Sequence, residues 1–99
     1  MKSFTHKFSA KVWLWEGKGA WHFVTIKKED AEEIKKDYMW PRRGFGAIPV
    51  NVMIGKTKWK TSVFPEKEGS CLLPLKKEVR VKEEINEGDE VSFTLEVIN

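Results

Sequence analysis

The chain has 99 residues, a length that fits a single domain over residues 1–99; 40% of them are hydrophobic and 33% are charged. These proportions exclude a disordered chain, and no apolar stretch approaches the length of a membrane span. The net charge is only +3, and lysines and acids are interspersed, which is typical of a solvated surface.

Cysteine usage and the start of the chain bear on its location. The lone cysteine, Cys71, has no partner for an internal disulfide and lies in the short apolar run Cys71–Leu73. The first residues lead straight into a polar/apolar alternation, without the apolar block of a signal peptide. We therefore expect a cytoplasmic protein in which Cys71 is buried and unreactive.

The first half of the chain predicts two strands, a helix and a loop. Polar and apolar residues alternate over Lys7–Trp15, which indicates a strand with one buried face. A turn over Glu16–Gly19 joins it to a returning strand over Trp21–Ile26. Helix formers, acids in the first turn and apolar residues at helical spacing predict a helix over Lys27–Asp37. Proline and glycine within Pro41–Gly46 then predict an irregular loop.

The second half of the chain is richer in strands. Alternation and turn residues predict strands over Ala47–Ile54, Thr57–Phe64, Ser70–Leu75 and Val91–Ile98. The charged segment Lys76–Ile85 is open to two interpretations, a helix or a further strand around Val79–Val81.

The two halves share an order of elements. Ile26-Lys27-Lys28-Glu29 matches Leu75-Lys76-Lys77-Glu78, and each tetrapeptide follows a short apolar strand and opens a charged segment. The chain therefore predicts two strand–strand–helix–strand units in tandem, related by a two-fold rotation. Their apolar faces can bury each other and close a small barrel of six main strands, with one clear helix over Lys27–Asp37.

Two family resemblances agree with this architecture. The stretches Leu72–Arg80 and Glu87–Val91 resemble the signature of AbrB-like swapped-hairpin domains. Over its full length the chain resembles the bacterial family called domain of unknown function 1905, through Gly19–Val24, Gly44-Phe45-Gly46 with Val50 and Val52, Trp59, Phe64, Leu73-Pro74 and Gly88-Asp89. The resemblance implies a mostly β fold, a small double-split β-barrel of two fused units with one or two short helices. It implies no known activity.

The sequence contains no recognisable catalytic motif. His6 and His22 are the only histidines, and neither has metal-ligand spacing to another histidine or to Cys71. A Gly-rich phosphate loop is absent, and the carboxylates lie among lysines in solvated segments. We therefore expect no enzyme activity, no cofactor and no metal, and interpret the domain as a binding or interaction module.

Five tryptophans are an unusual number for so short a chain. They are Trp13, Trp15, Trp21, Trp40 and Trp59. Trp13 and Trp15 share one strand face, and Trp21 is expected opposite them on the returning strand. The favoured interpretation is that the tryptophans fill a thin core. The alternative is a groove lined by Trp13, Trp15, Trp21 and Trp59 that binds a small ligand or peptide.

The cations offer two further candidate sites. In the loop, Arg42 and Arg43 lie between Trp40 and Phe45, so we expect any ligand site there, for a protein or a small anionic or planar partner. Lys58 and Lys60 share one face of a strand; with the tryptophans they could form an AbrB-like nucleic-acid surface. The modest net charge disfavours nucleic acid, and lysines also protect exposed strands from aggregation.

Overall fold

The computed structural model describes residues 5–38 and 46–98. In this part of the chain it has seven strands and two helices, in the order β1 (Thr5–Lys11), β2 (Trp13–Trp15), β3 (Trp21–Ile26), α1 (Lys28–Tyr38), β4 (Ile48–Ile54), β5 (Thr57–Pro65), β6 (Cys71–Pro74), α2 (Lys77–Lys82) and β7 (Glu90–Val97). Neither helix has the length and apolar character required to cross a bilayer.

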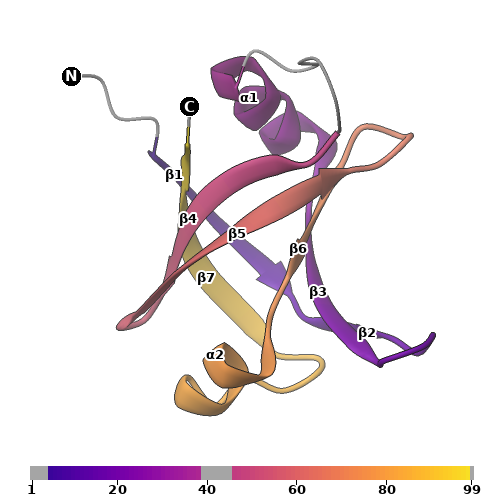
Figure 1. Cartoon of the computed structure of the whole chain (residues 1–99), viewed down its shortest axis with the longest axis vertical. Coiled ribbons are helices and arrows are strands. Elements are labelled where there is room, and N and C mark those ends of the chain that lie inside the picture. Colours follow the sequence, from indigo (N-terminus) through magenta and orange to yellow (C-terminus); the bar gives the residue numbers. More distant parts are fainter. Residues whose placement is uncertain (1–4, 39–45, 99) are drawn as a thin grey trace.

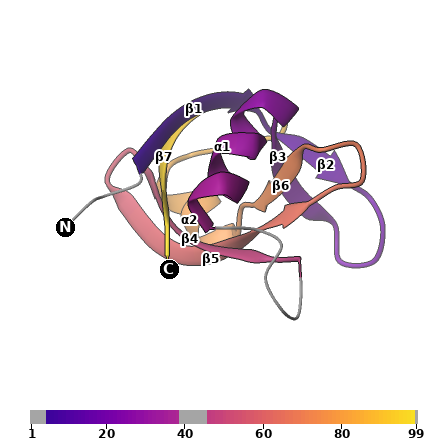
Figure 2. The same cartoon turned by 90° about the horizontal axis from the view of Figure 1, so that it is seen from above.

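The strands form one antiparallel sheet that closes on itself (Figures 1 and 2). Its order is β1-β7-β4-β5-β6-β3-β2. Only Val12 separates β1 from β2, so the two are halves of one bent strand. At the bend, the Val12 N–H donates to the Asp89 carbonyl (2.9 Å) and the Val12 carbonyl accepts from the Gly88 N–H (2.8 Å). Because β1 pairs with β7 while β2 pairs with β3, this bent strand closes a barrel of six strands.

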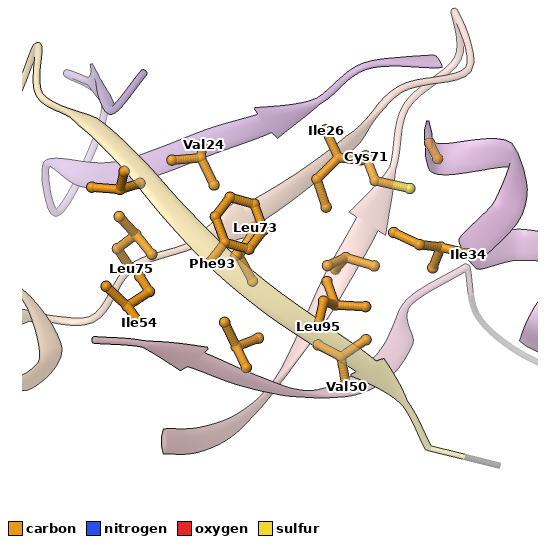
Figure 3. Close-up of a cluster of buried hydrophobic side chains, with 14 of the residues drawn as sticks. Val24, Ile26, Ile34, Val50, Ile54, Cys71, Leu73, Leu75, Phe93 and Leu95 are labelled. Carbon is orange, nitrogen blue, oxygen red and sulfur yellow. The ribbon is translucent and has the colours of Figure 1, made fainter. Parts of the chain in front are cut away.

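The core fills the interior of the barrel because successive strand residues point to opposite faces. The alternating residues of β4 and β7 are buried, as the pattern predicts. Figure 3 shows the inward side chains of several strands meeting in one cluster with Ile34 of α1 and with Leu75, which follows β6; among the strand residues are Val24, Ile26, Val50, Ile54, Leu73, Phe93 and Leu95.

The two helices lie at opposite ends of the barrel (Figure 1). Ala31 and Ile34 are the buried residues of α1, and His6 of β1 is joined to Asp37 near the end of that helix by a hydrogen bond between His6 Nε2 and Asp37 Oδ2. Helix α2 is short and buries Val79. Each helix thus covers one opening of the barrel with a few apolar side chains.

Most expectations for the elements are confirmed, and two need correction. The chain is mostly β and forms a small barrel, and α1 occupies the segment predicted as helix. The predicted strand Lys7–Trp15 is broken at Val12, because the chain there changes partner from β7 to β3. The strand interpretation of Val79–Val81 is wrong: these residues belong to α2, a second helix, which has Val79 buried and Val81 exposed.

Cys71 lies at the start of β6 with 0% of its surface exposed, as expected. Burial raises the pKa of its thiol to about 11. Because only the thiolate is nucleophilic, we expect the native protein to resist thiol reagents at pH 7 and to react rapidly once unfolded in urea. Timed alkylation followed by mass spectrometry checks this. Labelling of the native chain at the rate of the unfolded chain would contradict it.

Candidate functional site

An aromatic surface covers the outward faces of β2 and β3 and the neighbouring parts of β5 and β6. It borders a groove of about 420 Å³, here called the aromatic groove, which is lined by Trp13, Trp15, Trp21, Phe23, Phe64, Glu66 and Leu72. Its volume lies within the range of about 300–1,000 Å³ that is usual for small-molecule sites.

The strand register brings the rings together. Trp13 pairs with Phe23 and Trp15 with Trp21 across the β2–β3 hairpin, as expected for Trp21 from the sequence. The rings of Trp13 and Phe23 have centroids 5.2 Å apart, and those of Trp21 and Phe23 are stacked at 6.1 Å. The Trp13 indole N–H also donates to Thr25 Oγ1 at 2.9 Å. Cross-strand aromatic contacts of this kind stabilise a hairpin and fix the orientation of its rings.

The outer rings of the groove remain in solvent. Trp15 is 46% exposed, Trp21 51% and Phe64 44%, and Val81 on α2 is the other large hydrophobic residue exposed within residues 5–38 and 46–98. The interpretation of the tryptophans as core fillers is therefore wrong for Trp15 and Trp21. No second layer of the described chain packs on this side of the sheet, so their outward position leaves them in contact with water.

The hairpin turn holds Trp15 in place. Gly17 lies directly against the Trp15 ring, since a Cβ atom on Gly17 would come within 2.0 Å of the Trp15 Cη2 atom. Gly19, with φ of +91°, likewise has the Trp21 Nε1 atom 3.2 Å from its Cβ position. The turn therefore uses glycine at Gly17 because the indole occupies the space of a side chain.

Glu66 carries the charge in the aromatic groove. The backbone of its loop is fixed: the Glu66 N–H donates to the Ser70 carbonyl at 2.8 Å, and the Gly69 N–H donates to the Glu66 carbonyl at 3.0 Å. The Glu66 carboxylate, by contrast, makes no hydrogen bond or ion pair with any described residue. Glu66, whose carboxylate has no partner in the described chain, is thus one of the residues that line a surface otherwise made of rings and a leucine.

The lysines and Trp59 expected on the same face lie elsewhere. Lys58, Trp59 and Lys60 line a second groove, of about 390 Å³, together with Asn51, Met53, Thr94 and Glu96. Trp59 pairs with Val52 and is partly buried against the core. The six residues predicted for one surface therefore do not border a single groove. Trp13, Trp15 and Trp21 line the aromatic groove, whereas Trp59, Lys58 and Lys60 line the second groove.

A smaller hollow of about 160 Å³ lies where β5 and β6 diverge. Lys60 and Lys76 border it together with Trp21 and Trp59. Trp21 is thus shared between the aromatic groove and this hollow. The other candidate loop, with Trp40, Arg42, Arg43 and Phe45, lies outside the described residues, and the expectation of a site there stays a prediction.

The histidines do not join either groove. His6 is bonded to Asp37, and His22 lies opposite Leu14 on the inward side of β3. Burial, followed by the charge of Arg80, lowers the pKa of His22, and its Nδ1 atom is buried without a described partner. In the described ranges, no group of three or more His, Cys, Asp and Glu could hold a metal ion.

Four residues of the groove were missed in the sequence. Phe23 could have been found, since it lies two residues after Trp21 and therefore on the same strand face. Phe64, Glu66 and Leu72 carried no such local signal, because they reach the groove only through the pairing of β5 with β6 and of β6 with β3.

Comparison with known proteins gives a family and no activity. A search of the curated proteins finds no match to this chain. The family model described as "Domain of unknown function (DUF1905)" matches residues 8–95. That match spans the barrel from β1 to β7, so the chain belongs to the DUF1905 family.

Proposed function

We propose that this domain is a bacterial, cytoplasmic binding module without enzymatic activity, and that its aromatic groove holds a small ligand. The observation that carries the proposal is the gathering of Trp15, Trp21 and Phe64, all exposed, around one groove of ligand size. Contiguous exposed apolar surface of this kind marks binding sites on soluble proteins. The single cysteine, a buried free thiol, supports an intracellular location.

The rings are prepared for a ligand before it arrives. Trp21 is stacked on Phe23, Trp15 rests on Gly17, and Trp13 is hydrogen-bonded to Thr25. Aromatic side chains have few torsions to fix, and these contacts already restrict them, so binding loses little conformational entropy. The pairing of Trp13 with Phe23 is also explained by hairpin stability. Hairpin stability does not explain the exposed ring faces of Trp15, Trp21 and Phe64, because these faces lie in solvent. They are the surface that a ligand would cover.

The test uses planar neutral fragments such as indole, followed by NMR on the native chain. We expect the indole N–H signals of Trp15 and Trp21 to shift, and Trp21→Ala to weaken binding about tenfold. This follows because a covered ring face removes roughly 60 Å² of apolar surface from water at about 25 cal/mol per Å². Val81→Ala, at the exposed hydrophobic residue of α2, is the matched control and should leave the affinity unchanged. Equal affinity of the Trp21→Ala variant and the native chain would remove the groove as the site.

We also propose that the barrel is of the double-split, AbrB-like type, with two ββαβ units related by a pseudo-two-fold axis. The segments Ile26–Glu29 and Leu75–Glu78 lead from β3 into α1 and from β6 into α2, and β3 pairs with β6. The pairings correspond as well: β1 with β7 matches β5 with β4, and β2 with β3 matches β5 with β6. This agreement of pairings supports two equivalent units in one chain.

An AbrB-like nucleic-acid surface is the second candidate function. It is favoured by the hollow between β5 and β6, where Lys60 and Lys76 lie beside Trp21. Cations beside an exposed ring suit the phosphates and bases of a single strand. A labelled single-stranded oligonucleotide in the same screen, at low salt, distinguishes the two. If the native chain binds the oligonucleotide and the Lys60→Ala/Lys76→Ala variant does not, the result would favour nucleic acid over a small ligand.

A further inference from the structure

We infer that the aromatic groove selects a small organic cation, one with a methyl-rich ammonium head, with Glu66 as its counter-charge. The inference rests on the proposed function, because it assigns the ligand class of the same groove. Its two parts are the aromatic walls and the lone carboxylate at their border.

The walls of the groove suit a positive charge. The faces of aromatic rings carry negative potential, and tryptophan attracts a cation most strongly. Trp13, Trp15 and Trp21 contribute indole rings from the β2–β3 hairpin, and Phe64 contributes a ring from β5. Rings from more than one strand therefore border the same space, as in the aromatic cages that hold quaternary ammonium groups.

Charge complementarity gives the sign of the ligand. Among the residues that the structure describes, Glu66 is the one charged residue in the lining, and no lysine or arginine lines the groove. Lys35 donates to the Gly69 carbonyl at 3.0 Å and its charge acts on Glu68, and no ion pair joins Lys35 to Glu66. An anionic ligand would meet a carboxylate and no cation of the described chain here, whereas a cationic ligand gains both the rings and the carboxylate.

The composition of the walls selects the kind of cation. A metal ion needs several oxygen or nitrogen ligands, and the lining within residues 5–38 and 46–98 offers a single carboxylate among largely apolar side chains. A primary ammonium is strongly hydrated and loses that hydration against apolar walls. A methylated ammonium presents apolar methyl groups that spread its charge, so it can contact the rings directly. The groove volume of about 420 Å³ accommodates such a head and a short tail.

Choline and 3,3-dimethyl-1-butanol provide a matched pair of probes, since they share a shape and differ by a charged nitrogen in place of a carbon. In NMR titrations of the native chain we expect both to shift the Trp15 and Trp21 indole signals. Choline should bind about fivefold more tightly, because both the rings and the Glu66 carboxylate favour the cation. Glu66→Gln should reduce this preference to about twofold, the part that the rings still supply. Glu32→Gln, which removes one exposed charge on α1, controls for net charge and should retain the fivefold preference.

The outcomes separate this inference from the proposed function. Equal affinity of the groove for both probes would overturn the inference that it selects a cation. The proposed function would then stand, with the groove as a site for neutral ligands. A failure of both probes and of the neutral planar fragments to shift the groove signals overturns both proposals. Tight binding of a peptide carrying trimethyl-lysine, with no binding of choline, overturns the small-molecule assignment in favour of a protein partner. A dimer in sedimentation equilibrium that dissociates in Trp21→Ala also overturns the inference, because a second copy would then occupy the groove.

Discussion

Replacing Phe93 with alanine is expected to lower the free energy of unfolding by about 3–5 kcal/mol, the usual range for a buried phenylalanine. Phe93 is 2% exposed and has the largest volume among the fully buried side chains of the described residues. It lies in the middle of the barrel cluster (Figure 3), and its ring is 5.7 Å from that of Phe8 on the neighbouring strand. Because strands on all sides hold the interior open, the barrel cannot collapse into the space that the ring leaves. A domain of this size has a total stability of about 5–15 kcal/mol, so the variant should be only marginally folded.

Urea unfolding followed by tryptophan fluorescence measures the effect. Ser92→Ala is the matched control, since Ser92 is the preceding residue of β7, is exposed and points outward. We expect that change to stay within about 0.5 kcal/mol of the native chain. Phe93→Leu, which refills most of the space, should be intermediate. A loss below about 1 kcal/mol in Phe93→Ala would show that the barrel interior relaxes and is not closely packed.

The same alternation explains how much of the fold was predictable. The pattern Ile48, Val50, Val52, Ile54 gave the buried face of β4, because residues two apart in a strand share a face. The closure of the sheet into a barrel cannot be predicted from this alternation. The bend at Val12 depends on β7 and β3 offering separate edges to one strand, which is a property of the assembled barrel. The helix α2 was ambiguous because Val79–Val81 has the residues of a strand, and its burial against the barrel decides the conformation.

The site shows the limit of local patterns more sharply. Alternation correctly placed Trp13 and Trp15 on one face with Trp21 opposite. Whether that face is core or surface depends on a second layer of structure, which is not encoded in the hairpin itself. The prediction that the tryptophans are buried rests on the general behaviour of large aromatic residues, and it is wrong for Trp15 and Trp21. Glu66 could not be predicted as a site residue either, since its charge can contribute to binding only beside the rings that other strands bring to it.

A second large effect is expected at the β4–β5 turn. Gly55 has φ of +57°, a left-handed conformation, and a Cβ atom there would lie 2.1 Å from Oε1 of Glu83. Glu83 follows α2 and accepts hydrogen bonds from the Thr57 hydroxyl (2.6 Å) and from the Lys56 N–H (3.3 Å). Gly55→Ala therefore adds backbone strain and expels the carboxylate that ties α2 to this hairpin. We expect it to lower the free energy of unfolding by about 2–4 kcal/mol, and Glu83→Ala by about 1–2 kcal/mol.

A double-mutant cycle in urea tests this coupling. If Gly55→Ala already displaces the Glu83 carboxylate, the Gly55→Ala/Glu83→Ala variant should be no less stable than Gly55→Ala alone, so that the two losses do not add. Gly88 provides the control, since it also has a positive φ, +91°, and a Cβ atom there would meet nothing within 4 Å. Gly88→Ala should show the backbone strain alone, and its loss should add to that of Glu83→Ala. Additive losses for Gly55→Ala and Glu83→Ala would mean that the carboxylate keeps its hydrogen bonds when the methyl group is present. The connection between α2 and the hairpin would then not depend on glycine at this position.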